Sequence, residues 1–304
     1  SGLPRDWLKH LYSYEVEPFQ NIIEYLKDEY VSYPPNYYYS YSNLAIAVLG
    51  VVLERASGMG FEQYMNRYIF EPLEMNRTSF SRNYDLSRYY ASAYEGYKLK
   101  TEIPPRDKPG GGLNSCVSDL AKFLSMYCCG GVYKGKQILK SETIDYMLTP
   151  QTDSVAMSFS KSMGLNWHLG RPALEYAGRV AHHGGALVYY RSDLCILPDH
   201  GLGVAVTSNS SKAAQSVLDI ADFALQQALE IKTGIKPVKP KVKPFSLKHP
   251  LEPAEPEGHY GTSWGYIRIE QKRGMLICKI NGKLYKLVEA GDGSYGLEVK
   301  EGGN

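Results

Sequence analysis

The sequence lacks a strong net charge and a long apolar run. Its 34 Lys and Arg residues nearly balance its 32 Asp and Glu residues, so the formal net charge is only +2. This balance leaves no global field that would gather nucleic acid or an anionic membrane. The longest apolar run, residues 44–53, is about half as long as a membrane-spanning helix. We therefore expect a buried helix at this run, no transmembrane segment and no nucleic-acid partner.

Cysteine is also scarce. The five cysteines are an odd number at scattered positions, and the adjacent Cys128 and Cys129 form no Cys-x-x-Cys spacing. This pattern excludes a disulfide scaffold of the kind found in small secreted domains. The seven histidines show no pair at the spacing of a helical zinc site. We expect reduced thiols, no metal and no cofactor, and the reduced thiols together with the 26 tyrosines favour a cytoplasmic protein.

What the sequence does contain indicates a folded chain with more than one domain. It has 304 residues, of which 43% are hydrophobic and 22% are charged, with a mean hydropathy of -0.33. These values exclude a wholly disordered chain, and the length favours a large domain with a smaller one. Because the sequence begins at Ser1 without an initiator methionine, we expect a fragment, and the lack of a signal peptide then says little about location.

Hydrophobic periodicity predicts an α/β (α+β) protein. Apolar residues dominate 43–56 and Gly58 follows as a stop, which indicates a largely buried helix. Ser118 is expected to cap a helix that ends near Gly130. The turn Pro198-Asp199-His200-Gly201 is expected to join two antiparallel strands. Further helices are expected over 61–69, from Ser141 and over 213–230, and strands over 165–168, 186–197 and 203–207.

The last quarter of the chain has a different composition. Residues 236–256 are rich in Lys-Pro steps, which are typical of a semi-rigid linker; a basic patch for polyanions is the alternative interpretation. Short strands follow over 267–270, 275–280 and 284–288, with turns at Arg273-Gly274 and Asn281-Gly282. So few strands cannot close a barrel, so we predict an incomplete β module.

Three segments together resemble a known enzyme family. They are Pro34-Pro35-Asn36 before Tyr41-Ser42-Asn43; Pro109-Gly110-Gly111-Gly112-Leu113 before Ser118-Asp119-Leu120; and His182-His183-Gly184-Gly185. In this order, the segments resemble the β-lactamase-related serine hydrolases, which include class C β-lactamases, penicillin-binding DD-peptidases, D-aminopeptidases and esterases. The resemblance extends from Ser1-Gly2-Leu3-Pro4 to Asn209. It implies a β-lactamase-like antiparallel sheet flanked by helices, and acyl transfer to a serine followed by hydrolysis.

The resemblance also implies roles for individual residues. Tyr41 matches the tyrosine that serves as base and then acid, with nearby positive charge favouring its phenolate. Asn43 matches the amide that orients the catalytic lysine or a substrate carbonyl. His182 matches the Lys or His of the third element, with His183 as its spacer, while Gly184 and Gly185 allow the backbone to supply half of an oxyanion hole. Without this pattern, Tyr41 would be assigned to packing within its tyrosine-rich run.

The nucleophile of the family, the serine of a Ser-x-x-Lys motif, is expected upstream of Ser1. The sole internal match is Ser158-Phe159-Ser160-Lys161, which precedes a predicted strand and is therefore rejected. Lys232-Thr233-Gly234 ends a predicted helix, and Gly261-Thr262-Ser263-Trp264-Gly265 has no later histidine. These two matches are rejected as well. We predict that the chain as given lacks its nucleophilic serine and lysine and is inactive.

The sequence thus predicts a truncated hydrolase domain over 1–234, a Lys/Pro-rich linker over 235–257 and a partial lipocalin-like β domain over 258–304. The expected function is that of a serine hydrolase acting on peptide, amide or ester bonds. A histidine is mostly neutral at pH 7, so His182 in place of lysine favours a peptidase or esterase over a class C-type β-lactamase. The other alternative is a non-catalytic binding or scaffolding protein. The expected partners are a small-molecule or peptide substrate and other copies of the chain in a homo-oligomer.

Overall fold

The computed structural model describes residues 2–6, 10–29, 31, 34–82, 84–155, 158, 161–238, 257–262, 265–280, 283–289 and 295–297. The chain divides into two compact units. The first comprises Ser1–Met157 and Lys161–Pro240, and the second comprises Ser158–Ser160 and Lys241–Asn304. Each unit is described by itself.

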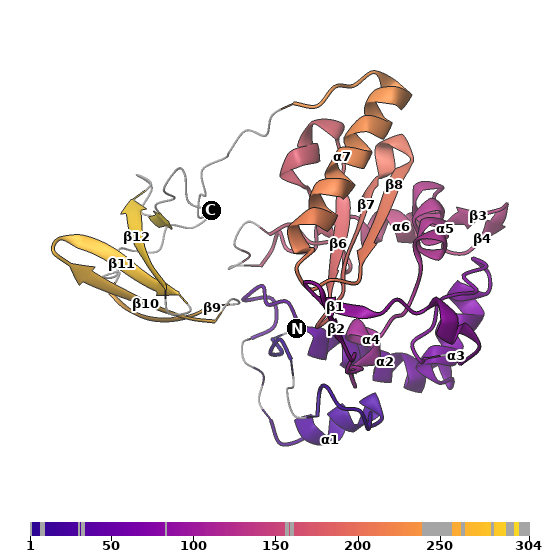
Figure 1. Cartoon of the computed structure of the whole chain (residues 1–304), viewed down its shortest axis with the longest axis horizontal. Helices are drawn as coiled ribbons and strands as arrows, with labels where there is room; N and C mark the ends of the chain where they lie inside the picture. Colours follow the sequence, from indigo (N-terminus) through magenta and orange to yellow (C-terminus); the bar gives the residue numbers. More distant parts are fainter. Residues whose placement is uncertain are drawn as a thin grey trace. The chain divides into compact units, whose positions relative to one another are not determined.

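A four-stranded antiparallel sheet organises the first unit. Its strand order is β5-β6-β7-β8, and Figure 1 shows it beside α7. The strands are β5 (His168–Leu169), β6 (Ala181–Ala186), β7 (Arg191–Leu197) and β8 (Leu202–Ser208). The predicted turn at 198–201 forms a short 3-10 helix, Pro198–His200, followed by Gly201 in the left-handed conformation. It joins β7 to β8 as expected, because glycine adopts a positive φ without steric cost.

Helices cover both faces of this sheet. Successive side chains of each strand point to opposite faces, so neighbouring residues pack against different helices. Ile196 of β7 belongs to one apolar cluster, together with Leu124 and Tyr127 of α5 (Val117–Cys128). The neighbouring Cys195 and Leu197 belong to a second cluster, with buried residues of α7 (Ala214–Thr233). The prediction of an antiparallel sheet flanked by helices is confirmed.

A helical region adjoins the sheet. Its main helix, α2 (Asn43–Ser57), ends at Gly58 in the left-handed conformation and is followed by α3 (Phe61–Met65) and a π-helical turn, Asn66–Phe70. The remaining α-helices of the unit are α1 (Ile22–Leu26), α4 (Lys108–Gly111) and α6 (Ser141–Met147). Short 3-10 helices cover Phe19–Asn21, Tyr84–Tyr89 and Pro172–Ala177, and two small hairpins are formed by β1 (Ala93–Glu95) with β2 (Lys98–Lys100) and by β3 (Val132–Tyr133) with β4 (Lys136–Gln137).

The second unit contains a five-stranded antiparallel sheet in the order β13-β12-β11-β10-β9. Its strands are β9 (Gly258–Thr262), β10 (Gly265–Lys272), β11 (Met275–Ile280), β12 (Lys283–Glu289) and β13 (Tyr295–Leu297). The three strands expected after residue 266 are therefore present. The predicted linker falls mostly on residues 239–256, which lie outside the described residues, as does the turn at Asn281-Gly282.

Three local predictions were wrong. Residues 186–197 do not form one strand, because the chain leaves the sheet between Ala186 and Arg191. The 43–57 helix is not largely buried, since Leu49 and Val52 are 57% and 53% exposed. Helix α5 begins at Val117, and Cys116 occupies its N-cap position, where its side chain contacts the Ser118 hydroxyl but caps no backbone N–H of the first turn. Ser118 is thus inside the helix and does not cap it.

Among the described residues, no helix is long and apolar enough to cross a membrane by itself. One bent pair, Asn43–Ser57 with Phe61–Phe70, passes the length and composition test when its two helices are taken together.

Candidate active site

The N-terminus of α2 is fixed to the first residues of the chain. Ser42 caps the helix by accepting a hydrogen bond from the backbone N–H of Ala45 (2.9 Å), and its hydroxyl donates to the carbonyl of Pro4 (2.6 Å). The Asn43 side-chain amide donates to Asp6 Oδ1 at 2.8 Å. These contacts set the positions of Tyr41 and Asn43, which flank the capping serine.

The glycine-rich segment after Lys108 packs directly on this helix. A Cβ atom on Gly50 would lie 2.4 Å from Cγ of Pro109, and one on Gly110 would lie 3.0 Å from the Asn43 carbonyl oxygen. Both glycines are therefore needed for the close approach of α4 to α2. This packing brings the second sequence segment of the family pattern against the first.

The third segment forms β6, where His182 and His183 point to opposite faces because they are neighbours in a strand. The rings of His183 and Tyr41 have centroids 6.2 Å apart. The His182 ring instead stacks on His168 of β5, with centroids 5.3 Å apart. The sequence prediction paired Tyr41 with His182 and treated His183 as a spacer. The geometry reverses these two positions.

Strand alternation could have revealed this reversal. The run His182-His183-Gly184-Gly185 contains the His-x-Gly pattern twice, once from His182 and once from His183. Only the second reading places its histidine and its last glycine, Gly185, on the face that carries the ring beside Tyr41. Gly184 and Gly185 are both exposed, and each lies opposite a residue of β7, Asp193 and Ser192 respectively.

His168 is a site residue that the sequence analysis did not identify. Its ring lies 5.3 Å from that of His182 and 5.6 Å from that of His183, measured between centroids. Pairing of β5 with β6 places it opposite His182. The three imidazoles and Tyr41 therefore form one connected group of rings, which becomes visible only once the strands are paired.

All three imidazoles are held neutral at pH 7. Burial, with further contributions from His183 and Lys161, lowers the pKa of His168 from 6.5 to about 4. Burial also lowers the pKa of His182 to about 4, with additional contributions from the charge of Arg171 and from both neighbouring histidines. The pKa of His183 is lowered by burial, while a hydrogen bond with the Gly184 backbone opposes the shift.

Tyr41 is a protonated phenol in this arrangement. Burial raises its pKa; the nearby Arg5 opposes the shift and Asp6 adds to it. The Arg5 guanidinium lies 5.9 Å from the centre of the tyrosine ring. We expected nearby positive charge to favour a phenolate at Tyr41. Arg5 does not do so, because burial raises the pKa of Tyr41 more than the Arg5 charge lowers it.

A buried ion-pair network lies on the His182 side of β6. Arg171 contacts Asp193 (Nη1 to Oδ2, 2.6 Å) and Asp222 of α7 (Nε to Oδ1, 2.6 Å). It also donates to the carbonyl of Leu218 at 3.0 Å. One buried cation thus holds the segment after β5 against both β7 and α7. Burial raises the pKa of both aspartates, and Arg171 opposes this shift.

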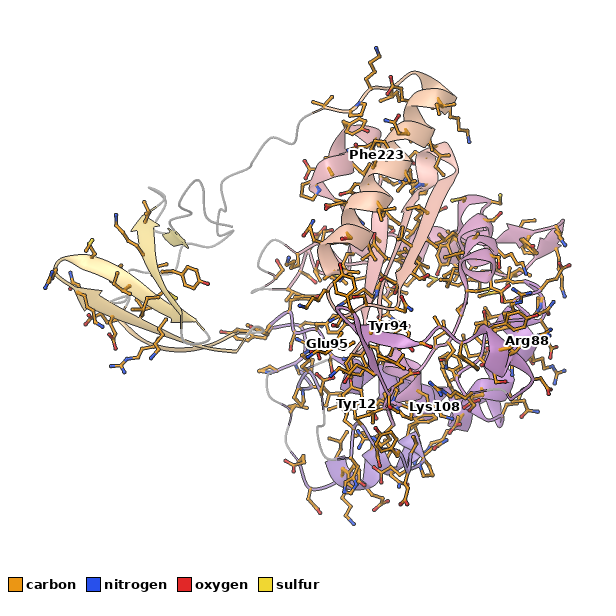
Figure 2. The ribbon with its side chains drawn as sticks, in the orientation of Figure 1. Tyr12, Arg88, Tyr94, Glu95, Lys108 and Phe223 are labelled. Atoms are coloured by element: carbon orange, nitrogen blue, oxygen red, sulfur yellow. The ribbon has the colours of Figure 1, made fainter. Side chains whose placement is uncertain are left out.

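A cavity of about 580 Å³ lies beside the glycine-rich segment. Its apolar lining includes Phe19, Phe61, Phe80, Leu113 and Leu187. Leu187, which directly follows β6, is a lining residue four positions after His183 in the sequence. At its rim Lys108, labelled in Figure 2, contacts Glu62 at 2.5 Å. Tyr41, His168, His182 and His183 do not line this cavity.

A family model described as Beta-lactamase matches residues 1–229. The chain belongs to the beta-lactamase family. The predicted family, one of serine hydrolases, is therefore confirmed.

Two curated relatives illustrate the extent of the match. Penicillin-binding protein 4* of Bacillus subtilis (strain 168) is 26% identical over 260 residues, which cover 74% of this chain and 53% of that protein. The human mitochondrial serine beta-lactamase-like protein LACTB is 30% identical over 210 residues, which cover 60% of this chain and 38% of LACTB. The chain therefore spans about half of the first relative and less of the second.

Solved structures of beta-lactamase-family proteins share the fold. The octameric penicillin-binding protein homologue from Pyrococcus abyssi superposes with a TM-score of 0.61 at 22% identity, covering 94% of this chain and 66% of that chain. The crystal structure of SurE superposes with a TM-score of 0.70 at 20% identity, covering 100% of this chain and 70% of that chain. At these identities, the similarity shows the fold alone.

The rejected sequence matches occupy places that differ from those the family chemistry needs. Ser158 lies in neither a helix nor a strand. Lys232 and Thr233 end α7, and Gly234 adopts the left-handed conformation as its terminator. Residues 261–265 run from β9 into β10, so this match connects two strands and not a strand with a helix. Among the described residues, no group of three or more His, Cys, Asp or Glu side chains could hold a metal ion.

Proposed function

We propose that the protein that carries this chain is a serine hydrolase that forms an acyl-enzyme with peptide, amide or ester substrates. The observation that carries the proposal is the pairing of Tyr41, at the N-terminus of α2, with His183 of β6. A serine hydroxyl is a weak nucleophile until a neighbouring group takes its proton. Tyr41 would take that proton from the serine and then donate it to the leaving group. A lysine ammonium close to Tyr41 would favour the phenolate form of Tyr41, which Arg5 alone does not.

The other site residues receive supporting roles in this proposal. His183 would donate a hydrogen bond toward Tyr41 or the substrate, in place of the role first assigned to His182. Asn43 would orient the lysine or a substrate carbonyl, provided that its amide leaves Asp6, to which it now donates. The exposed backbone at Gly184 and Gly185 would supply half of the oxyanion hole. The nucleophile would come from a Ser-x-x-Lys segment other than Ser158–Lys161.

Neutral histidines support a peptidase or an esterase over a β-lactamase. A fixed cation at this position would bind the carboxylate of a β-lactam, whereas burial lowers the pKa of His182 and His183. Two neighbours described as Beta-Lactamase/D-Alanine Carboxypeptidase, and SurE solved with D-Leu, support substrates that contain a D-amino acid. The octameric homologue supports a homo-oligomer. A cytoplasmic location stays a prediction.

The test is a substrate panel on the longer protein that includes a Ser-x-x-Lys segment. Nitrophenyl esters and D-aminoacyl amides should be hydrolysed with a higher kcat/KM than nitrocefin. If nitrocefin is the best substrate by a wide margin, the preference for peptides and esters is wrong and the β-lactamase alternative is correct.

A non-catalytic binding protein is the second candidate. It is favoured by one observation: the sole Ser-x-x-Lys match in the chain, at Ser158, lies outside the helices. A fluorophosphonate probe distinguishes the two functions. Labelling of an upstream serine in the longer protein supports the hydrolase, and tight binding of substrate without labelling or turnover supports the binding protein. We expect no labelling of the 304-residue chain; stoichiometric labelling that disappears in Ser158→Ala would show that Ser158 was wrongly rejected.

A further inference from the structure

The second unit has one sheet face that combines cations with aliphatic side chains. Pairing of β10 with β11 sets Lys272 opposite Met275 and Glu270 opposite Ile277. Pairing of β11 with β12 sets Lys286 opposite Ile277. Paired residues share a face, and residues two apart in a strand share it as well. We call this surface the basic-aliphatic face; it comprises Arg268, Glu270, Lys272, Met275, Ile277, Lys279, Leu284, Lys286 and Val288.

This face meets solvent, whereas the opposite face carries one buried cysteine. Met275, Leu284 and Val288 are 43%, 62% and 46% exposed. Cys278, which points to the opposite face, is only 3% exposed. Exposed aliphatic side chains grouped on one surface are typical of a binding surface. Figure 2 shows side chains projecting from β10, β11 and β12.

The charges of the basic-aliphatic face are strongly unequal. Its single carboxylate, Glu270, is already shared by Arg268 (2.5 Å) and Lys272 (3.0 Å). Lys279 on the face and Arg273 in the adjoining turn have no ion pair among the described residues. The net charge of +2 for the whole chain therefore hides a local excess of positive charge.

The aliphatic groups and the cations also share a shallow hollow. It has a volume of about 520 Å³ and is lined by Met275, Ile277 and Leu284 together with Lys272, Arg273 and Lys286. Lysine and arginine can place their hydrocarbon stems along such a surface while their charged ends reach outward. The hollow thus offers an apolar floor within a positively charged rim.

We infer that the basic-aliphatic face binds the surface of a lipid bilayer that carries anionic headgroups. Aliphatic side chains would enter the boundary between headgroups and acyl chains, and the cations would contact the headgroups. This binding is independent of the hydrolase chemistry of the first unit.

The test is co-sedimentation of the full chain with vesicles. Phosphatidylcholine vesicles with about one third phosphatidylglycerol should bind the chain, and pure phosphatidylcholine vesicles should not. Binding should weaken as salt is raised from about 50 mM to about 500 mM, because salt screens the headgroup charge. The double variant Arg273→Gln/Lys279→Gln should lower the partition coefficient roughly thirtyfold, and Leu284→Ser should lower it about tenfold.

A matched variant and four results make the inference falsifiable. Lys98→Gln/Lys136→Gln removes two exposed lysines of the first unit and should bind like the parent chain. Equal binding to both kinds of vesicle, or equal binding by the Arg273/Lys279 variant, would overturn the inference. It is also overturned if monomeric dodecyl phosphate binds the hollow while vesicles do not, or if light scattering shows dimers of the chain that Leu284→Ser converts to monomers. Unchanged circular dichroism and melting temperature exclude misfolding as the cause of lost binding.

Discussion

Each face of β6 carries one histidine, and the two histidines, His182 and His183, have different surroundings. His183 faces Tyr41 beside the N-terminus of α2. His182 stacks on His168 and lies within reach of the Arg171 charge. The first face continues at the exposed Gly185, and the second carries the buried ion-pair network of Arg171 and Asp193. Strand alternation thus turns His183 toward Tyr41 and His182 toward Arg171, while the ring of His168 lies near both histidines.

The largest expected effect tests the His182 face. Arg171→Met removes the cation that holds the buried Asp193 and the partly buried Asp222. Because unpaired buried carboxylates remain, the free energy of unfolding should fall by about 3–5 kcal/mol in denaturant titrations. The control is Arg179→Met, which removes an ion pair of an arginine whose side chain is 56% exposed and should cost less than about 1 kcal/mol. Similar losses in the two variants would contradict a structural role for the Arg171 network.

The second prediction tests the His183 face in the longer protein. His183→Ala should lower kcat/KM by about 10²–10³-fold, because it removes a hydrogen-bond donor beside the acid–base tyrosine. His182→Ala should lower kcat/KM less than about tenfold. The His182 ring faces His168, so it helps to position the site residues and takes no part in proton transfer. Steady-state kinetics on an ester substrate measures both values. A larger loss in His182→Ala would restore the first assignment from sequence.

The third prediction compares two neighbouring glycines. A Cβ at Gly185 would lie 2.2 Å from the Ser192 hydroxyl, whereas the nearest atom to a Cβ at Gly184 is 3.6 Å away. Gly185→Ala forces that hydroxyl into another rotamer and should lower the free energy of unfolding by about 0.5–1.5 kcal/mol. Gly184→Ala should change it less. Thermal denaturation checks the order, and the added Ser192→Ala substitution should remove the cost at Gly185 because it deletes the clashing oxygen.

The remaining prediction concerns pH. His168 and His182 have a pKa of about 4 in the folded chain and 6.5 when unperturbed. Between these values the unfolded chain binds protons that the folded chain does not, so the free energy of unfolding falls as pH falls from about 6.5 to about 4. Above this window the contribution is constant.

The variant His168→Gln/His182→Gln should therefore show a shallower loss of stability over that range than the parent chain. Imidazole proton signals in NMR titrations identify the residues directly. If His182 titrates near 6.5 in the folded chain, its ring is not buried against His168 and Arg171 as described, and the distinction between the two faces is weakened.

Features set by local interactions could be predicted from the sequence. Helix α2 ends at Gly58 and helix α7 ends at Gly234 because a left-handed terminator is a property of the glycine itself. The turn after Leu197 could be predicted for the same reason. The family pattern identified Tyr41 and Asn43 at the N-terminus of a helix, and that is where they lie.

Features that depend on distant residues could not be predicted in this way. The length of the strand after Gly185 was overestimated, because Leu187 to Tyr190 are as apolar and aromatic as strand residues but leave the sheet. The Arg171 network joins a loop, a strand and a helix, and no periodicity links those positions. The same holds for His168, whose role follows from the pairing of β5 with β6.

The sequence by itself determined the family, the order of its three segments, the principal helices and strands, and the presence of a separate β module. Only the tertiary structure decided which of two adjacent histidines faces Tyr41, and which sheet face of the β module collects cations around exposed aliphatic side chains. The physical reason is the same in both cases. A sequence gives the alternation of side chains along a strand, but strand pairing and helix packing decide which of the two alternating sets is covered.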